Sequence, residues 1–157
     1  ALDMLLNEKH CISYKMITDY WKDTGTPEDI INANKTILEN MVPEFKGKKD
    51  STVLIQGNVS IGNNTRISDQ VKIIGPVIIG NKCNISGDAI IGPNTSIGNE
   101  CNILGGTIQD SIIMNNCKIG KNVNLRNSII SSNSTIVQNN IKNEQVFLVG
   151  EGTKVSF

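Results

Sequence analysis

Isoleucine recurs at every sixth position through the middle of the chain. The nine positions are Ile55, Ile61, Ile67, Ile73, Ile79, Ile85, Ile91, Ile97 and Ile103. The fourth residue after each isoleucine is small or β-branched in every case: Val59, Thr65, Val71, Val77, Cys83, Ala89, Thr95, Cys101 and Thr107. A period of six fits neither a helix, with its period of 3.6, nor a strand, with its period of two. The pattern indicates a chain that turns a corner every six residues.

Three such segments close a triangular coil of about 18 residues, the repeat of a hexapeptide parallel β-helix. The isoleucines are predicted to point into the prism and to stack from coil to coil, with the small residues beside the corners. Asparagine and glycine are expected at corners that need a positive φ. These are Asn63, Asn64, Gly75, Asn81, Gly87, Asn94, Asn99 and Asn122. About five coils are predicted between residues 55 and 140.

Four further isoleucines adjoin the inward positions and are expected to point outward: Ile74, Ile78, Ile90 and Ile112. On stacked coils such residues form an apolar stripe, which predicts self-association of the prism. The period also slips from six to five, between Ile103 and Ile113 and between Leu125 and Ile130. Around the two slips the sequence repeats Ser-Ile-Ile after Asp110 and after Asn127. Sharper corners are the favoured interpretation of these short steps, with a ligand groove as the alternative.

The first forty residues follow a different pattern. Leucines near the start suggest a helix, and the alternation of Ile12, Tyr14 and Met16 suggests a strand. Thr26 as N-cap, Pro27 at the first helical position and Asp29 three residues after the cap predict a second helix. Its apolar stripe contains Ile30, Ile31, Ala33, Ile37 and Leu38. These elements cannot bury their apolar faces alone, so they are expected to dock on a part absent from this chain, on the end of the solenoid, or on a neighbour.

The expected organisation is therefore a mainly β chain in four parts. Residues 1–40 form a helix-strand-helix unit, residues 41–50 a linker, residues 51–142 the β-helix and residues 143–157 a C-terminal cap. Phe147 and Phe157 are suited to cover the open end of the prism, whose strand edges and core would otherwise be exposed.

Composition narrows the possible functions. The 157 residues hold 15 basic and 15 acidic side chains, and this balance argues against a general nucleic-acid binder. No apolar run approaches the ~20 residues that span a bilayer, so no membrane partner is expected. Cys83, Cys101 and Cys117 occupy small inward positions and are interpreted as structural thiols rather than metal ligands, while Cys11 lies in the expected strand. Free thiols suit a reducing cytoplasm.

The run from Tyr20 to Asn34, Tyr-Trp-Lys-Asp-Thr-Gly-Thr-Pro-Glu-Asp-Ile-Ile-Asn-Ala-Asn, resembles the end of the catalytic domain of sugar-1-phosphate nucleotidylyltransferases. The similarity is greatest to the long form of glucose-1-phosphate thymidylyltransferases, whose C-terminal domain is a hexapeptide solenoid. The Ser-Ile-Ile repeats and the closing Val149-Gly150-Glu151 also resemble that group. The resemblance implies a left-handed coil and identifies residues 1–40 as the remnant of an α/β nucleotidyltransferase domain.

The resemblance also implies a reaction. In that family a sugar 1-phosphate attacks a nucleoside triphosphate and releases pyrophosphate, and the Asp of the Trp-x-Asp-Thr-Gly motif helps to hold Mg²⁺. The matching residue is Asp23. The family's Gly-rich nucleotide loop and Lys motif are absent from these 157 residues, so the chain alone is expected to be inactive, with no catalytic residue and no cofactor-binding residue besides Asp23. Its expected role is that of a structural, regulatory or oligomerisation module, with a homotrimer as the implied assembly.

The alternative function is that of a hexapeptide-repeat acyltransferase acting on an amino sugar. Such enzymes use a histidine on the coil as general base. The single histidine, His10, precedes the repeat. The sequence therefore favours the nucleotidyltransferase over the acyltransferase.

Overall fold

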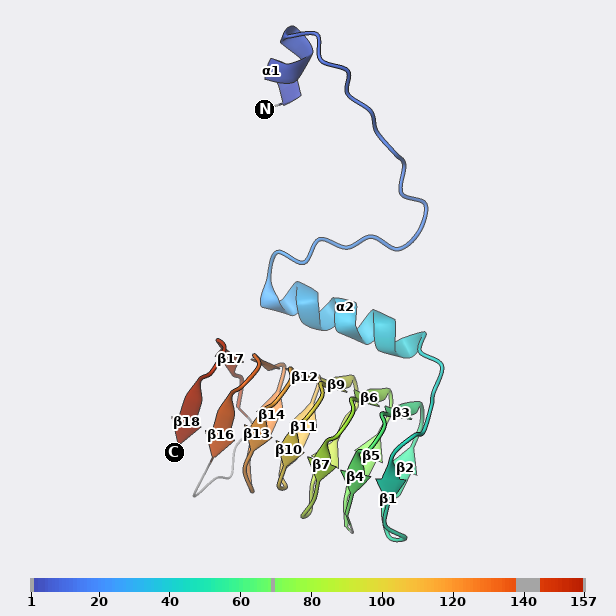
Figure 1. Ribbon diagram of the computed structural model, residues 1–157, viewed down its shortest axis with the longest axis vertical. Helices are drawn as coiled ribbons and strands as arrows, with labels where there is room; N and C mark the ends of the chain where they lie inside the picture. The colour runs from blue at the N-terminus through green and yellow to red at the C-terminus, as the bar shows by residue number, and fades with distance from the viewer. Residues whose placement is uncertain (1, 69, 138–144, 157) are drawn as a thin grey trace.

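The chain folds as a three-sided parallel β-solenoid with one helix lying along a side (Figure 1). The computed structural model describes residues 2–68, 70–137 and 145–156. The described strand pairings are all parallel, and each strand inside a sheet pairs with the equivalent strands of the coils before and after it. This arrangement confirms the predicted β-helix.

Three sheets form the sides of the prism. The seven-stranded sheet contains β1 (Lys48–Lys49), β4 (Arg66–Ile67), β7 (Asn84–Ile85), β10 (Asn102–Ile103), β13 (Lys118–Ile119), β16 (Thr135–Val137) and β18 (Lys154–Ser156). The five-stranded sheet contains β2 (Leu54–Gln56), β5 (Lys72–Ile74), β8 (Ile90–Ile91), β11 (Thr107–Gln109) and β14 (Asn124–Arg126). The six-stranded sheet contains β3 (Val59–Ile61), β6 (Val77–Ile79), β9 (Thr95–Ile97), β12 (Ile112–Ile113), β15 (Ile129–Ile130) and β17 (Leu148–Val149).

Strands β2 to β16 make the five coils that the period predicts, and the flanking strands extend the solenoid to about six turns. Strand β1 lies in the segment expected as a linker, and β17 and β18 lie in the segment expected as a cap. Phe147 packs against the end of the core, and its backbone N–H donates to the Ser128 hydroxyl. Phe157, the second expected capping residue, lies outside the described residues.

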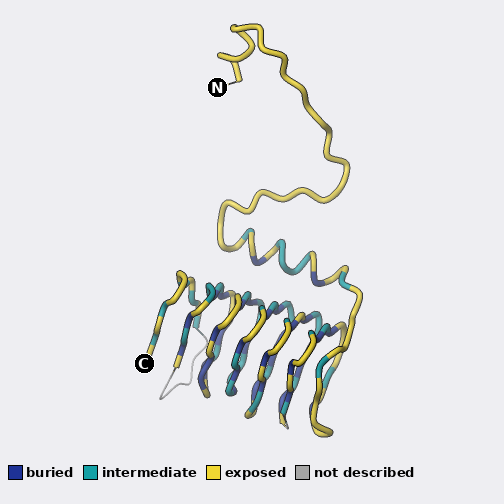
Figure 2. The backbone as a smooth tube through the Cα atoms, viewed as in Figure 1, coloured by how far each residue is buried: buried dark blue, intermediate teal, exposed yellow. Residues whose placement is uncertain are grey.

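The predicted isoleucine column forms the core. Eight of the nine isoleucines at the sixth positions are buried, and Ile55, in the first full coil, is partly buried against them. Buried residues recur along the successive coils from β3 to β16 (Figure 2). Ile67 lies opposite Ile85, a step of 18 residues, whereas Ile97 lies opposite Ile113 and Ile113 opposite Ile130. The later coils are thus one or two residues shorter, as the slips in the period predict.

One column of the small inward positions is made of hydrogen-bond donors. The side chains of Thr65, Cys83, Cys101, Cys117 and Ser134 each donate to a carbonyl oxygen of the next coil. The distance from Cys101 Sγ to the Met114 carbonyl is 3.0 Å. Hydrogen bonds with the thiols of Cys117 and Cys83, together with burial, raise the pKa of Cys101. The three inner cysteines are free thiols, as expected.

One inward position is corrected. Thr107, expected inside the prism, lies between Ile90 and Asn124 on the outer surface of the five-stranded sheet and is only partly buried. The five-residue step moves its inward position to Gly106, where an added Cβ would lie 2.1 Å from the Val123 carbonyl oxygen. A side chain therefore has no room at this corner.

Positive φ angles occur at the corners, though not at every predicted residue. Asn64, Gly87, Asn94 and Asn122 have positive φ as expected. At the corners containing Asn81 and Asn99, the following residues have the positive φ instead. The two asparagines there accept hydrogen bonds from the backbone N–H of the equivalent residue one coil earlier. Their role is structural, as a ladder that joins successive corners.

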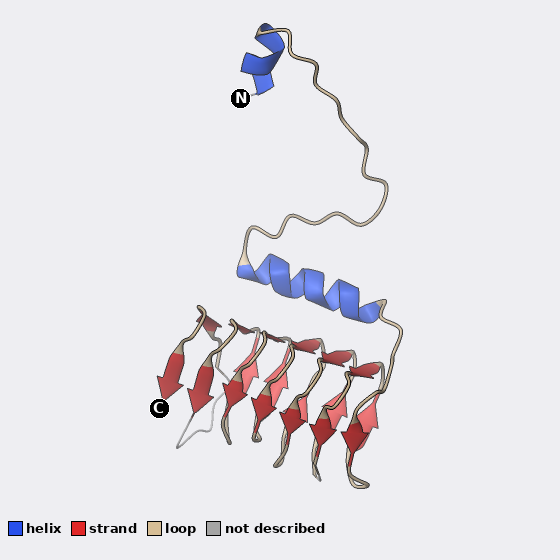
Figure 3. Ribbon diagram, in the orientation of Figure 1, coloured by secondary structure: helices blue, strands red, loops and turns tan. Residues whose placement is uncertain are grey.

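The N-terminal region differs from the expectation. Helix α1 (Leu2–Asn7) and helix α2 (Pro27–Glu39) form, but residues 12–16 form no strand (Figure 3). A strand needs a partner edge, and no described strand pairs with this segment. All residues from 2 to 28 are exposed, including Tyr14 at 90% and Trp21 at 68%. The helix-strand-helix prediction is therefore wrong in its middle element.

The inward isoleucines should tolerate no charge. We expect Ile91→Asp to destabilise the solenoid by more than about 4 kcal/mol, because Ile91 is fully buried and a carboxylate there would find no partner. Thermal unfolding followed by circular dichroism measures the effect. The matched control is Ile78→Asp, an outward isoleucine that is 39% exposed and lies outside the five-stranded sheet, and it should cost less than about 1 kcal/mol. Equal thermal midpoints for Ile91→Asp and the unmodified chain would contradict the assignment.

Candidate functional site

Helix α2 lies along the outer surface of the six-stranded sheet (Figure 1). The helix begins as its sequence predicts: Thr26 is the N-cap and accepts a hydrogen bond from the backbone N–H of Asp29, and Pro27 follows the cap. Ile31 and Leu38, two turns apart on one side of the helix, are buried. The helix thus covers the side of the prism to which Ile78 and Ile112 belong.

Polar contacts fix the middle of the helix to the solenoid. The Asn34 amide donates to the Asn94 carbonyl at 3.3 Å, and its oxygen accepts a hydrogen bond from the Ser96 hydroxyl. The Lys35 ammonium lies 3.0 Å from a carboxylate oxygen of Asp110. Two consecutive helical residues therefore bind two successive coils.

Asp110 is the centre of the polar interface. Its carboxylate also accepts from the Asn94 amide at 2.9 Å and lies 3.8 Å from the Arg126 Nε, and the Asp110 side chain is 14% exposed. Burial by itself would raise the pKa of Asp110, but the Asn94 amide, the Lys35 ammonium and Arg126 together hold it below its usual value. The ionised form is thus favoured beneath the helix.

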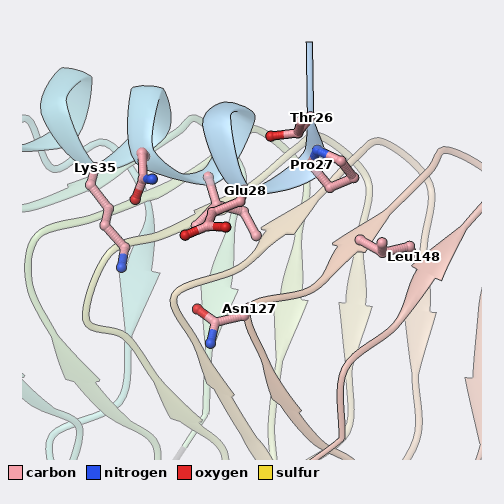
Figure 4. Close-up of a pocket in the computed structure, with 8 residues that line it drawn as sticks. Thr26, Pro27, Glu28, Lys35, Asn127 and Leu148 are labelled. Atoms are coloured by element: carbon pink, nitrogen blue, oxygen red, sulfur yellow. The ribbon is translucent and has the colours of Figure 1, made fainter. Parts of the chain in front are cut away.

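A cavity of about 560 Å³ opens beside this interface, between the first turns of α2 and the later coils (Figure 4). Its lining combines apolar and polar side chains: Thr26, Pro27, Glu28, Ile31, Asn32, Lys35, Asn127 and Leu148. Asn127 occupies the corner of the next coil that is equivalent to the corner of Asp110, and the two residues have the same φ of 47°. The two Ser-Ile-Ile repeats thus place Asp110 under the middle of the helix and Asn127 under its beginning.

The segment that precedes α2 is tied to its first turn. The Lys22 ammonium lies 2.7 Å from one carboxylate oxygen of Asp29, and the Thr26 hydroxyl donates to the other, also at 2.7 Å. These hydrogen bonds lower the pKa of Asp29, and Asp29 in turn raises that of Lys22. The loop that contains Trp21 and Asp23 is therefore linked to the helix through a neighbouring side chain.

Asp23, the expected metal ligand, lies exposed in this loop. Mg²⁺ needs several oxygen ligands, usually including one or two carboxylates. Within residues 2–68, 70–137 and 145–156, no three His, Cys, Asp or Glu side chains gather in a way that could hold a metal ion. Asp23 therefore does not form a magnesium site with the other described residues. His10, also before the solenoid, contacts Glu8 at 3.2 Å on the surface.

Docking of the N-terminal elements on the end of the solenoid is one of the sequence predictions, but helix α2 lies along the side of the prism instead. The residues that meet there are not predicted, because the contacts of Asn34 and Lys35 join residues sixty or more positions apart. One further signal is the five-residue step at Asp110, for which the sequence favours sharper corners over a ligand groove. In the structure this corner receives a helix of the same chain.

Comparisons with known proteins agree with the fold. The family model described as the GMPPB C-terminal domain matches residues 73–156, more than half of the chain. A glucose-1-phosphate thymidylyltransferase from Streptomyces antibioticus is 33% identical over 69 residues, which cover 44% of this chain and 19% of that enzyme. A bifunctional protein GlmU from Methanococcus aeolicus is 37% identical over 67 residues, 43% of this chain and 16% of that protein. The matches thus span less than a fifth of these relatives.

Among solved structures, a hexapeptide transferase family protein from Anaplasma phagocytophilum is similar with a TM-score of 0.43 and 20% identity. The alignment covers 70% of this chain and 69% of that one. Within the described part of the chain, neither helix has the length and apolar character needed to cross a bilayer.

The lowered pKa of Asp110 predicts acid-sensitive docking of α2. A carboxyl group whose pKa is lower in the folded state stabilises the fold above its unfolded pKa of about 3.9, and this contribution disappears as the pH falls through the folded value. We expect an NMR titration of the Asp110 carboxyl to show a pKa below that of an exposed Asp, and Lys35→Met to raise it. A titration unchanged by Lys35→Met would contradict the ion pair.

Proposed function

Because the chain belongs to the family of GMPPB C-terminal domains, we propose that it is the solenoid part of a sugar-1-phosphate nucleotidyltransferase. The proposed reaction joins a nucleoside triphosphate to a sugar 1-phosphate and releases pyrophosphate, with thymidine triphosphate and glucose 1-phosphate as the proposed pair. The family match over the coils is the observation that carries the proposal. The match to a thymidylyltransferase supports the choice of nucleotide and sugar.

The N-terminal region supports the same function. The run from Trp21 to Gly25 resembles a motif that closes the catalytic domain in such enzymes, and it comes just before α2. Large apolar side chains between Leu2 and Trp21 are exposed, which is typical of a surface that packs on another domain. We propose that this segment packs on a nucleotide-binding domain.

A cytoplasmic location is also proposed, because free thiols suit a reducing compartment.

Asp23 is proposed as one of the carboxylates that hold Mg²⁺ in the whole enzyme, the remaining ligands coming from residues outside this chain. Bound Mg²⁺ would neutralise charge on the phosphate oxygens. This chain contributes the loop that contains Asp23, the Lys22–Asp29 ion pair that joins the loop to α2, and the contacts that hold α2 on the coils. The chain by itself is proposed to be inactive.

The solenoid is proposed to bring several copies together, as a trimer. Helix α2 covers the six-stranded sheet, so Ile78 and Ile112 lie on the side that the helix occupies. Ile74 and Ile90 lie instead on the five-stranded sheet, where Ile74 is opposite Gln56 and Lys72 separates Ile90 from Leu54, which is 59% exposed. This second side is the proposed contact between copies.

The reaction is tested with the full-length protein. We expect pyrophosphate release when Mg²⁺, thymidine triphosphate and glucose 1-phosphate are all present, and a loss of at least about tenfold in kcat/KM for Asp23→Asn. Asp19→Asn, a nearby exposed acid outside the motif, is the matched control and should keep activity. Turnover of acetyl coenzyme A and an amino sugar, without pyrophosphate release, would favour the acyltransferase instead.

Assembly is tested by sedimentation of this chain. We expect a species about three times the 17.1 kDa mass of one chain. Ile90→Asp should shift the distribution towards the single chain, since it places a charge in the proposed contact. The matched change Ile78→Asp, on the side occupied by α2, should leave any association through the five-stranded sheet unchanged. A 17.1 kDa species at all concentrations would exclude self-association.

A further inference from the structure

Helix α2 connects the loop at residues 20–25 to the solenoid, with polar contacts to the loop at its first turn and to the solenoid at its middle. Lys22 binds Asp29 in the first turn, and Lys35, less than two turns further on, binds Asp110. Asn34 adds its two hydrogen bonds to Asn94 and Ser96. An ion pair thus joins α2 to the loop and another joins it to the solenoid. The apolar side chains that the helix buries are Ile31 and Leu38 alone.

The apolar contact alone leaves the helix weakly held. Burial of two side chains offsets only part of the entropy that is lost when a thirteen-residue helix is ordered. The solenoid does not need α2, because its coils are closed by their own isoleucines and backbone ladders. The helix is thus a unit that can detach while the coils remain folded.

Asp110 is the residue best placed to control this step. It contacts Lys35 on the helix, Asn94 on the preceding corner and Arg126 on β14, and its side chain is largely covered. We propose that Asp110 is a positioning residue: it holds α2 on the solenoid, and through α2 and the Lys22–Asp29 pair it sets the position of the loop from Tyr20 to Gly25. The importance of that loop for catalysis rests on the proposed function, but the positioning itself does not.

The central test measures hydrogen exchange of the α2 amides in this chain. In Asp110→Asn these amides should exchange about five- to tenfold faster, while the inward strand residues keep their rates. Asparagine fits the corner, because Asn127 has the same φ of 47° at the next one. Lys35→Met removes the pair from the helix side without touching the solenoid, so it tests the contact even if Asp110→Asn disturbs the corner. The double variant should be no faster than the faster single variant, since both remove one interaction.

The control removes a pair of similar geometry that does not touch the helix. Lys82 and Glu100 lie 3.0 Å apart on the solenoid surface. The variants Lys82→Met and Glu100→Gln should leave α2 exchange unchanged. Unchanged α2 exchange in both Asp110→Asn and Lys35→Met, or additive effects in the double variant, would overturn the proposal.

A second readout follows the loop itself. Trp21 is the only tryptophan of the chain, so 5-fluorotryptophan gives a single ¹⁹F signal beside Lys22. Asp110→Asn and Lys22→Met should both narrow this signal as the loop gains freedom, but Lys22→Met should leave α2 exchange unchanged. An unaltered signal in Asp110→Asn would overturn the positioning of the loop. Neither readout needs activity, so a failure of the nucleotidyltransferase assay would leave these results standing and would refute only the proposed function.

Discussion

The structure depends on in-register stacking of isoleucine inside a narrow prism. Each inward side chain lies between its equivalents in the neighbouring coils, for example Ile85 between Ile67 and Ile103. Parallel pairing aligns identical side chains, so one residue type repeated at one spacing fills the interior without aromatic side chains. The six aromatic residues accordingly lie outside the full coils, in the first 45 residues and near the C-terminus.

A second constraint is the satisfaction of polar groups at the corners. Where the chain turns, backbone carbonyls face a narrow part of the interior, and the hydroxyl and thiol column supplies donors for them. Threonine, cysteine and serine exchange places within this column because each offers a small donor. The asparagine ladder does the same on the outside for backbone N–H groups. Cysteine is here a packing and hydrogen-bonding residue.

The repeat made most of the fold predictable, because a spacing of six has few structural explanations. The start of α2 was equally readable, since Thr26, Pro27 and Asp29 act through local backbone geometry. Thr107 was misplaced because a five-residue step leaves open which residue is deleted from the repeat. The strand at residues 12–16 was misjudged because alternation predicts a strand only where a partner edge exists. The Asp110 interface depends on how a helix lies across a sheet, and no local pattern encodes that contact.

The coils are nearly interchangeable units, and each touches only its immediate neighbours. A whole turn can therefore be gained or lost at the C-terminal end without disturbing the rest, so the length of such a prism is open to change by duplication. The helix limits this freedom. Its polar contacts reach two consecutive corners, with Asn34 on Asn94 and Lys35 on Asp110. A duplicated turn inserted between these corners would move them apart and break one of the two contacts, whereas a turn added beyond β15 would not. Variation in length among related solenoids should then be concentrated away from the helix's contact points.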